Sequence, residues 1–305
     1  MKLYFLIQFK MLNRHLAAFG IHPVIGCVLI LAAFTGSSVL IFEKTAFAEY
    51  LYLAASLSFL ARLSDPARNQ FLRSCFGKKD YRVVRMLENV IVAAPFAAFL
   101  VIEKYYFHAL AALFLAGFMS LTIVGNRSGF TIPTPFGKRP FEFTVGFRNS
   151  FPVIVLAWFL TVMAVISGNF NLGIASLILV FLVCFSYYLN PENEFYVWIF
   201  NSRPGIFLFG KIKTALVYAT FLTLPVSLVL SVFYSDKILI IGAFQLLGYI
   251  YLGAVVLAKY SSYPHPMNLP QFIILVVSVW FPPLLLAVIP FFYRKSSIRL
   301  KTLLA

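Results

Sequence analysis

The side chains best suited to chemistry lie in one polar segment between two apolar runs. Residues 190–213 read NPENEFYVWIFNSRPGIFLFGKIK, in which acidic and aromatic residues come before a proline break and a Gly-Lys pair. Aromatic and arginine side chains are enriched where proteins bind one another, so this composition predicts a binding surface rather than a catalytic centre. The residues expected to contact a partner are Glu194, Phe195, Trp198, Ser202, Arg203, Pro204 and Lys211.

Familiar catalytic motifs are missing from the sequence. It contains no GxSxG, HExxH, CxxC or P-loop string and no obvious pair of carboxylates. Cys27, Cys75 and Cys184 lie far apart, without the spacing of metal ligands. We therefore expect a protein that is not an enzyme and that binds no metal.

Long apolar runs must position the polar segment. Hydrophobic residues make up 61% of the 305 residues and charged residues 11%, against about 25% charged residues in a soluble domain. A bilayer core about 30 Å thick is crossed by about 20 apolar residues. Stretches close to that length lie at 20–42, 45–61, 86–102, 105–124, 151–168, 170–189, 214–234, 238–258 and 271–293. The pattern predicts an all-α polytopic membrane protein with about eight transmembrane helices and a broken C-terminal segment.

Basic residues indicate the orientation of these helices. Most of the 25 lysines and arginines fall in the loops 62–85, 125–149 and 190–213, whereas the alternate loops are short and nearly neutral. Because basic loops stay in the cytoplasm, the N-terminus is predicted to be cytoplasmic. The net charge of +15 thus reflects topology and anionic lipid, not nucleic acid. Residues 1–17 read either as an amphipathic helix in the interface or as an early start of the first span.

The last apolar stretch, 271–293, conflicts with a simple count of crossings. Nine full crossings from a cytoplasmic N-terminus would leave the basic C-terminal tail outside. Pro282-Pro283 lies near the middle of this stretch and breaks a helix. We expect a re-entrant segment that returns the tail to the cytoplasm; the alternative is one kinked span with an external tail.

A parallel repeat is a further hypothesis within a single transmembrane domain, 1–305. Residues 69–79 resemble residues 193–203 at an offset of 124, which would relate 17–124 to 150–259. This echo suggests Phe71, Phe76 and Lys79 as secondary partner-binding residues. A second echo, of Glu142-Phe143-x-Val145 with Glu194-Phe195-x-Val197, adds Glu142 and Phe143.

Arg85 and Glu88 stand at the entry of the third span. Their i, i+3 spacing favours a pair with each other at the interface. The alternative is a transport pathway, since ionisable residues within a membrane often mark one.

The segment 190–213 resembles the cytoplasmic loop of ABC-2-type exporter permeases. Glu194 takes the position of their acid, Ser202-Arg203-Pro204 that of their break, and Gly210-Lys211 that of their Gly-Lys pair. The strings at 133–151 and 188–198 are similar to a divergent class of small bacterial permeases encoded beside an ATPase subunit. The chain departs from that superfamily in having more than six predicted spans and almost no outer loop.

This resemblance implies a permease subunit of the bacterial cytoplasmic membrane. ATP would be bound and hydrolysed by a separate ABC ATP-binding subunit, with no cofactor in this chain, and the permease would work as a homodimer or as one of a pair of membrane subunits. The alternatives are an ATP-independent carrier or channel and, less favoured, a membrane-embedded enzyme that modifies lipid.

Overall fold

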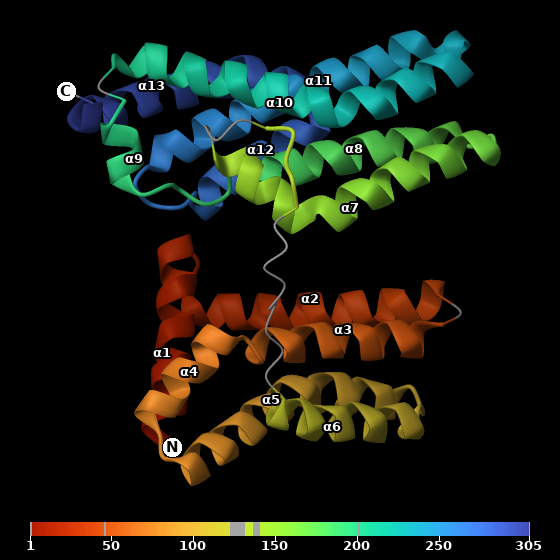
Figure 1. Ribbon diagram of the computed structural model, residues 1–305, viewed down its shortest axis with the longest axis vertical. Coiled ribbons are helices and arrows are strands. Elements are labelled where there is room, and N and C mark those ends of the chain that lie inside the picture. Colours follow the sequence, from red (N-terminus) through yellow and green to blue (C-terminus); the bar gives the residue numbers. More distant parts are fainter. Residues whose placement is uncertain (1, 46, 123–131, 137–140, 201, 305) are drawn as a thin grey trace. The chain divides into compact units, whose positions relative to one another are not determined.

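A computed structural model describes residues 2–45, 47–122, 132–136, 141–200 and 202–304 (Figure 1). Every regular element in this part of the chain is helical. The chain divides into two compact units, Met1–Gly129 (unit 1) and Phe130–Ala305 (unit 2). Parts of the predicted loop 125–149, with Arg127, Lys138 and Arg139, lie outside the described residues.

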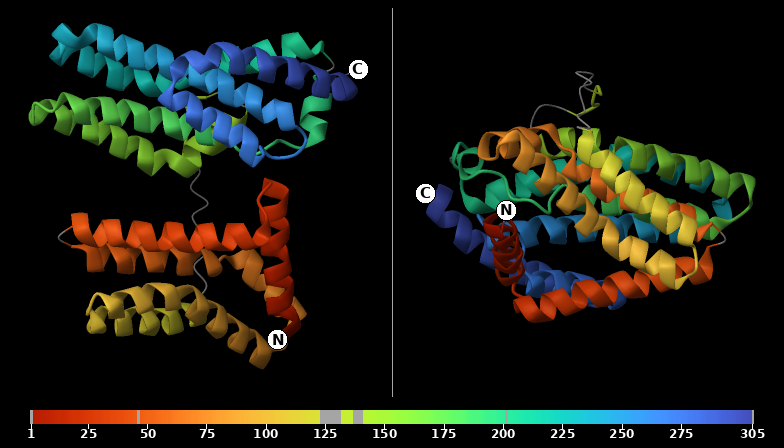
Figure 2. Two further views of the ribbon diagram at one scale, coloured as in Figure 1. Left: turned by 180° about the vertical axis from the view of Figure 1, so that it is seen from behind. Right: turned by 90° about the horizontal axis from the view of Figure 1, so that it is seen from below.

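Unit 1 begins with the predicted N-terminal helix. Its helices are α1 Lys2–Phe19, α2 Pro23–Lys44, α3 Ala48–Leu63, α4 Pro66–Cys75, α5 Lys78–Ile102 and α6 Tyr106–Leu121. α3, α5 and α6 pack against one another, while α1 contacts α2 and runs across one end of the unit in both side views (Figures 1 and 2).

Unit 2 is built around the long helices that follow the central loop. Its helices are α7 Phe141–Ile166, α8 Phe170–Ser186, α9 Glu194–Trp198, α10 Pro204–Phe233, α11 Ile238–Ser262, α12 Leu269–Trp280 and α13 Leu285–Leu304. α8 packs against α7, α10 and α11, and α13 packs along α11. One continuous core, which includes Leu177, Leu208 and Val256, joins these helices.

Within the described ranges, five helical segments are long and apolar enough to cross a membrane: Pro23–Lys44, Lys78–Ile102, Phe141–Ile166, Pro204–Phe233 and Ser235–Ser262. α6, α8 and α12 are apolar but shorter. The structure therefore supports an all-α, multi-pass membrane protein. The predicted number of eight spans goes beyond these five and stays a prediction.

Two long helices begin earlier than hydropathy predicts. α7 starts at Phe141 instead of 151, and α10 starts at Pro204 instead of 214. Pro204 occupies the first position of its helix, where the missing N–H costs nothing. The extra turns carry Glu142 and Lys211, which the apolar pattern alone would leave in loops.

The predicted break in the last apolar stretch is present. α12 ends at Trp280, a 3₁₀ turn covers Pro282–Leu284, and α13 then runs through the basic tail to Leu304. Proline cannot donate the backbone hydrogen bond that would continue α12. Whether the two halves enter and leave on one side of a membrane stays a prediction.

Both units share one order of elements. In unit 1 the pairs α2–α3 and α5–α6 flank the short helix α4, and in unit 2 the pairs α7–α8 and α10–α11 flank the short helix α9. Each short helix is capped by an Asx side chain: Asp65 accepts from the backbone N–H of Arg68 at 3.0 Å, and Asn193 accepts from that of Phe195 at 3.0 Å.

Candidate functional site

The predicted partner-binding segment forms α9 and the turn into α10, at one end of unit 2 (Figure 1). Phe195 and Trp198 expose 57% and 60% of their surfaces. Glu194 and Arg203 are also exposed, while Ser202 and Pro204 are half-buried. The segment thus presents aromatic, acidic and basic side chains outward, as a binding surface requires.

A buried residue fixes α9 to the rest of unit 2. Val197 has no exposed surface and belongs to the main core. α9 also packs against α13. Since exposed aromatic residues surround one fully buried valine, α9 is held in a defined orientation with its aromatic face uncovered.

Two carboxylates and two ammonium groups meet directly beside this segment. Glu142 comes from α7, Glu192 from the loop before α9, Lys211 from α10 and Lys259 from α11. Of the predicted site residues, Glu142 and Lys211 are therefore brought together, although both are buried and neither lies on the surface with Glu194. We call these four residues the ionic cluster.

Each lysine of the ionic cluster contacts both acids. Lys211 Nζ lies 2.8 Å from Glu142 Oε1 and 3.3 Å from Glu192 Oε1. Lys259 Nζ lies 3.7 Å from Glu142 Oε1 and is in direct contact with Glu192 Oε2. No side chain in the cluster is more than 9% exposed. Buried charges persist only when they are paired, so each of the four depends on the others.

Tyrosines complete the surroundings of Glu192. The Tyr260 hydroxyl donates to Glu192 Oε1, and the Tyr263 hydroxyl donates to its backbone carbonyl at 3.0 Å. Burial alone would raise the pKa of the Glu192 carboxyl. Lys259 and Lys211, with the hydrogen bonds from Lys259 and Tyr260, outweigh burial and hold this pKa at about 2, below its ordinary 4.5. Glu192 is therefore ionised at neutral pH.

Two oxygens in this region have neither a hydrogen bond nor an ion-pair contact. They are Glu142 Oε2 and the Tyr188 hydroxyl, both buried. Buried polar atoms normally have a partner, and exceptions indicate a site for water or ligand.

A cavity of about 430 Å³ adjoins the ionic cluster. Glu142, Glu192 and Lys259 are its buried charged lining residues. Amide and hydroxyl groups line the rest, from Asn149, Ser150, Ser186, Tyr187 and Asn190, together with the apolar Phe141, Val145 and Pro191.

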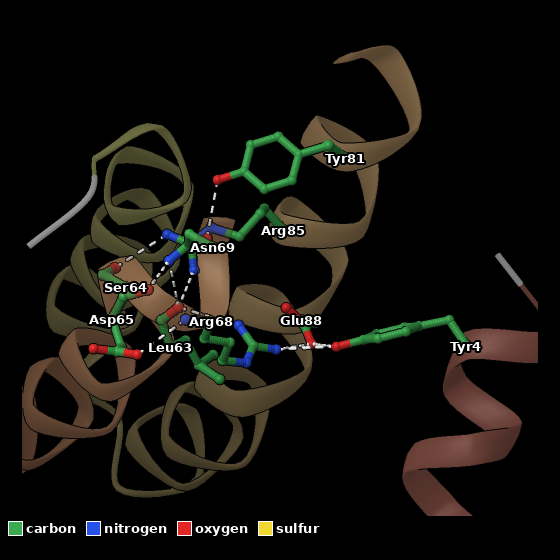
Figure 3. Close-up of polar contacts among 9 residues, drawn as sticks. All are labelled: Tyr4, Leu63, Ser64, Asp65, Arg68, Asn69, Tyr81, Arg85 and Glu88. Atoms are coloured by element: carbon green, nitrogen blue, oxygen red, sulfur yellow. Dashed lines mark hydrogen bonds and ion pairs between the residues drawn. The ribbon is translucent and has the colours of Figure 1, made fainter. Parts of the chain in front are cut away.

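Unit 1 holds a separate polar network at its α4 end (Figure 3). Glu88 of α5 pairs with Arg68 of α4 and accepts a hydrogen bond from the Tyr4 hydroxyl of α1. Burial, followed by the hydrogen bond to Glu88, raises the pKa of Tyr4 to about 12. The expected pair between Arg85 and Glu88 is not the one observed, because Arg68 takes the carboxylate.

Arg85 instead forms hydrogen bonds with the ends of two neighbouring helices. Its guanidinium donates to the carbonyls of Leu63 at 2.5 Å, Met119 at 3.1 Å and Thr122 at 3.0 Å. These carbonyls belong to the C-terminal ends of α3 and α6, which lack partners within their own helices. Arg85 is fully buried, and its hydrogen bonds join the ends of α3 and α6.

The secondary partner-binding residues divide between surface and core. Phe71 and Lys79 are exposed, and Phe76 is half-buried with its ring 5.7 Å from that of Tyr4. Phe143 is fully buried, where its ring lies 5.2 Å from that of Tyr187. Phe143 and Glu142 thus support the site from within.

Sequence reasoning missed Glu192 and Lys259 as members of one cluster. Their pairing is a tertiary contact between residues in different segments, and no short sequence motif predicts it. The available indication was a lone lysine at the end of the apolar run 238–258, because an ionisable residue at such a depth needs a partner.

No protein-family model matches the chain, and neither a curated protein nor a solved structure matches it. Among the described residues, no group of His, Cys, Asp and Glu is arranged to hold a metal ion.

Proposed function

We propose that this chain is the permease subunit of an ABC-type exporter, with α9 as the element that docks on a separate ATP-binding subunit. One observation carries the proposal: α9 exposes Phe195 and Trp198 while Val197 is fully buried. An exposed aromatic face on a rigidly seated short helix suits a protein interface. The resemblance of residues 190–213 to ABC-2 permeases supplies the class of partner.

The ionic cluster supplies a mechanical link for this function. Glu192, two residues before α9, contacts Lys211 of α10 and Lys259 of α11. A displacement of α9 by its partner would therefore act on two long helices through charged contacts that cannot be left unpaired. In this way ATP hydrolysis on the partner would move the membrane helices.

The proposed topology has about eight spans, a cytoplasmic N-terminus and a location in the bacterial cytoplasmic membrane. Arg85 joins the ends of α3 and α6 in unit 1, and the ionic cluster joins the loop before α9 and the end of α11 to the first turns of α7 and α10 in unit 2. In each unit these contacts lie at the end that carries the short helix, α4 or α9. We propose that this end faces the cytoplasm and that the tail after α13 returns there.

The proposed 124-residue repeat, 17–124 with 150–259, gains support from the shared order of elements. In each unit an ion pair also joins the short-helix segment to the next long helix: Arg68 to Glu88, and Glu192 to Lys211. The positions of acid and base are reversed between the two units: the short-helix segment supplies the base in unit 1 and the acid in unit 2. A homodimer, or a pair of such subunits, would present two α9 docking elements to two ATPase subunits.

An ATP-independent carrier is the second candidate, favoured by the buried ionic cluster beside a cavity. Copurification separates the two. The tagged chain, isolated from its native membrane in mild detergent, should bring with it a P-loop subunit and ATPase activity. Glu194→Ala, Arg203→Ala and Trp198→Ala should release that subunit, because truncating one partner at a buried interface costs about 2–5 kcal/mol.

Lys44→Ala is the control, since Lys44 is exposed at the end of α2 in unit 1. It should leave copurification and the ATPase rate unchanged. If no ATPase copurifies with the parent, or if all four variants behave like it, the exporter proposal is wrong and the carrier reading replaces it.

A further inference from the structure

The cavity beside the ionic cluster has the features of a built binding site. Its volume of about 430 Å³ lies within the usual range for small-ligand sites, about 300–1,000 Å³. Its lining combines buried charged side chains with amide and hydroxyl groups. Neither feature belongs to the α9 surface proposed to bind an ATPase.

The charges limit which ligand the cavity can take. The ionic cluster contains two carboxylates and two ammonium groups, so its charge already sums to zero. A ligand of net charge would bring an uncompensated charge beside it, at a high desolvation cost. A ligand with no net charge avoids that cost.

The unpartnered atom defines one group of the ligand. Glu142 Oε2 is buried, accepts no hydrogen bond and belongs to a residue that lines the cavity. A carboxylate oxygen requires an N–H or O–H donor, and a positively charged donor makes the stronger bond. Asn149 and Asn190 lie in the same cavity and can donate amide hydrogens to an anionic group of the ligand.

We infer that this cavity binds a zwitterion whose primary ammonium donates to Glu142 and whose anionic group contacts the amides of Asn149 and Asn190. The position fits the headgroup level of a bilayer, because Glu142 is the second residue of α7 and Lys259 lies in the last turn of α11. The same chemistry occurs in phosphatidylethanolamine and in free amino acids. The inference does not rest on the ABC proposal.

Methylation of the nitrogen provides the test. Phosphatidylcholine differs from phosphatidylethanolamine in its trimethylated nitrogen, which keeps the charge but has no N–H to donate. Betaine differs from glycine in the same way. Native mass spectrometry of the delipidated full chain in detergent measures the occupancy of each lipid, and ligand-dependent thermal unfolding measures glycine against betaine.

The parent should bind the primary amine about tenfold more tightly than its trimethylated analogue, the ratio that one charge-assisted hydrogen bond supplies. A preference for phosphatidylethanolamine over phosphatidylcholine, without one for glycine over betaine, identifies a site for a lipid headgroup. A preference in the amino-acid pair alone identifies a soluble ligand.

Variants locate the binding in this cavity. Glu142→Gln should reduce the preference to about twofold or less, whereas Glu43→Gln, the same change on an exposed residue of α2, should keep it. Asn149→Trp should block binding while leaving the ionic cluster intact, because Asn149 is an exposed lining residue outside the cluster. If Glu142→Gln fails to fold, Asn149→Trp still tests whether the ligand binds in this cavity.

The inference is wrong if the parent shows no preference in either pair, or if phosphatidylglycerol binds as well as phosphatidylethanolamine. It is equally wrong if the preference survives in both Glu142→Gln and Asn149→Trp. Because the measurements use the chain without an ATPase, their failure leaves the copurification result unaffected.

Discussion

Lys211 and Glu142, 69 positions apart in the sequence, form a buried ion pair with 2.8 Å between Nζ and Oε1. The pair joins the first turns of α7 to those of α10, close to the point where α9 meets the rest of unit 2. It makes the position of these helix ends dependent on charge, which hydrophobic packing alone would not do.

Replacing Lys211 by methionine should destabilise unit 2 strongly. The substitution keeps the volume but leaves Glu142 and Glu192 with one lysine between them, and such a loss costs about 3–5 kcal/mol. Lys213→Met is the matched control, two residues further along α10 and exposed. Thermal unfolding in detergent should show a large decrease for Lys211→Met and almost none for Lys213→Met; equal midpoints would show that the pair contributes little.

Stability should depend on pH through Glu192. Its pKa is about 2 in the folded chain against an ordinary 4.5, so protons bind the unfolded chain first. The contribution is complete above about pH 4.5 and is lost as the pH falls from 4.5 toward 2. The unfolding midpoint of the parent should decrease in this window more steeply than that of Glu192→Gln. If the unfolding midpoints of the parent and of Glu192→Gln fall equally with pH, the low pKa of Glu192 is contradicted.

Arg85→Lys should lower the stability of unit 1. A lysine keeps the charge but lacks the planar fork that reaches the carbonyls of Leu63, Met119 and Thr122 together. Loss of two such hydrogen bonds costs about 2 kcal/mol or more. Arg82→Lys is the control, since Arg82 is exposed on the same helix. Limited proteolysis at the ends of α3 and α6 should accelerate in Arg85→Lys only.

Two glycines of α11 should respond oppositely to a methyl group. A Cβ at Gly248 would lie 2.4 Å from the Phe181 ring, whereas a Cβ at Gly242 meets nothing within 4 Å. Overpacking typically costs about 1–3 kcal/mol, while alanine in an open helical position is favoured over glycine by about 1 kcal/mol. Gly248→Ala should therefore lower the unfolding midpoint and Gly242→Ala should raise it slightly. A tolerated Gly248→Ala would mean that α8 and α11 can separate.

Hydropathy predicted the helices well because lipid exposure and core burial both select apolar residues. The break at Pro282-Pro283 was also predictable, since it follows from the chemistry of one residue type. The start of α7 was placed ten residues too late, because Glu142 and Phe143 read as loop residues until Lys211 and Tyr187 are brought against them.

The ionic cluster itself could not be predicted from local pattern. Its four members come from four segments, and only the packing of α7, α10 and α11 decides which acid meets which base. The pairing of Glu88 with Arg68 instead of Arg85 has the same origin: spacing allows the neighbour on the helix, but α4 brings a competing guanidinium to the same carboxylate.

The two polar networks also differ in when they can be completed during synthesis. In unit 1 the last partner of Arg85 is Thr122, so the N-terminal half can close its network before the second half is made. In unit 2, Glu142 emerges at the start of α7 but must wait for Lys211 and then for Lys259 near the end of α11. A nascent chain halted after α8 would therefore hold Glu142 without Lys211 and Lys259, the two lysines that pair with it in the folded unit.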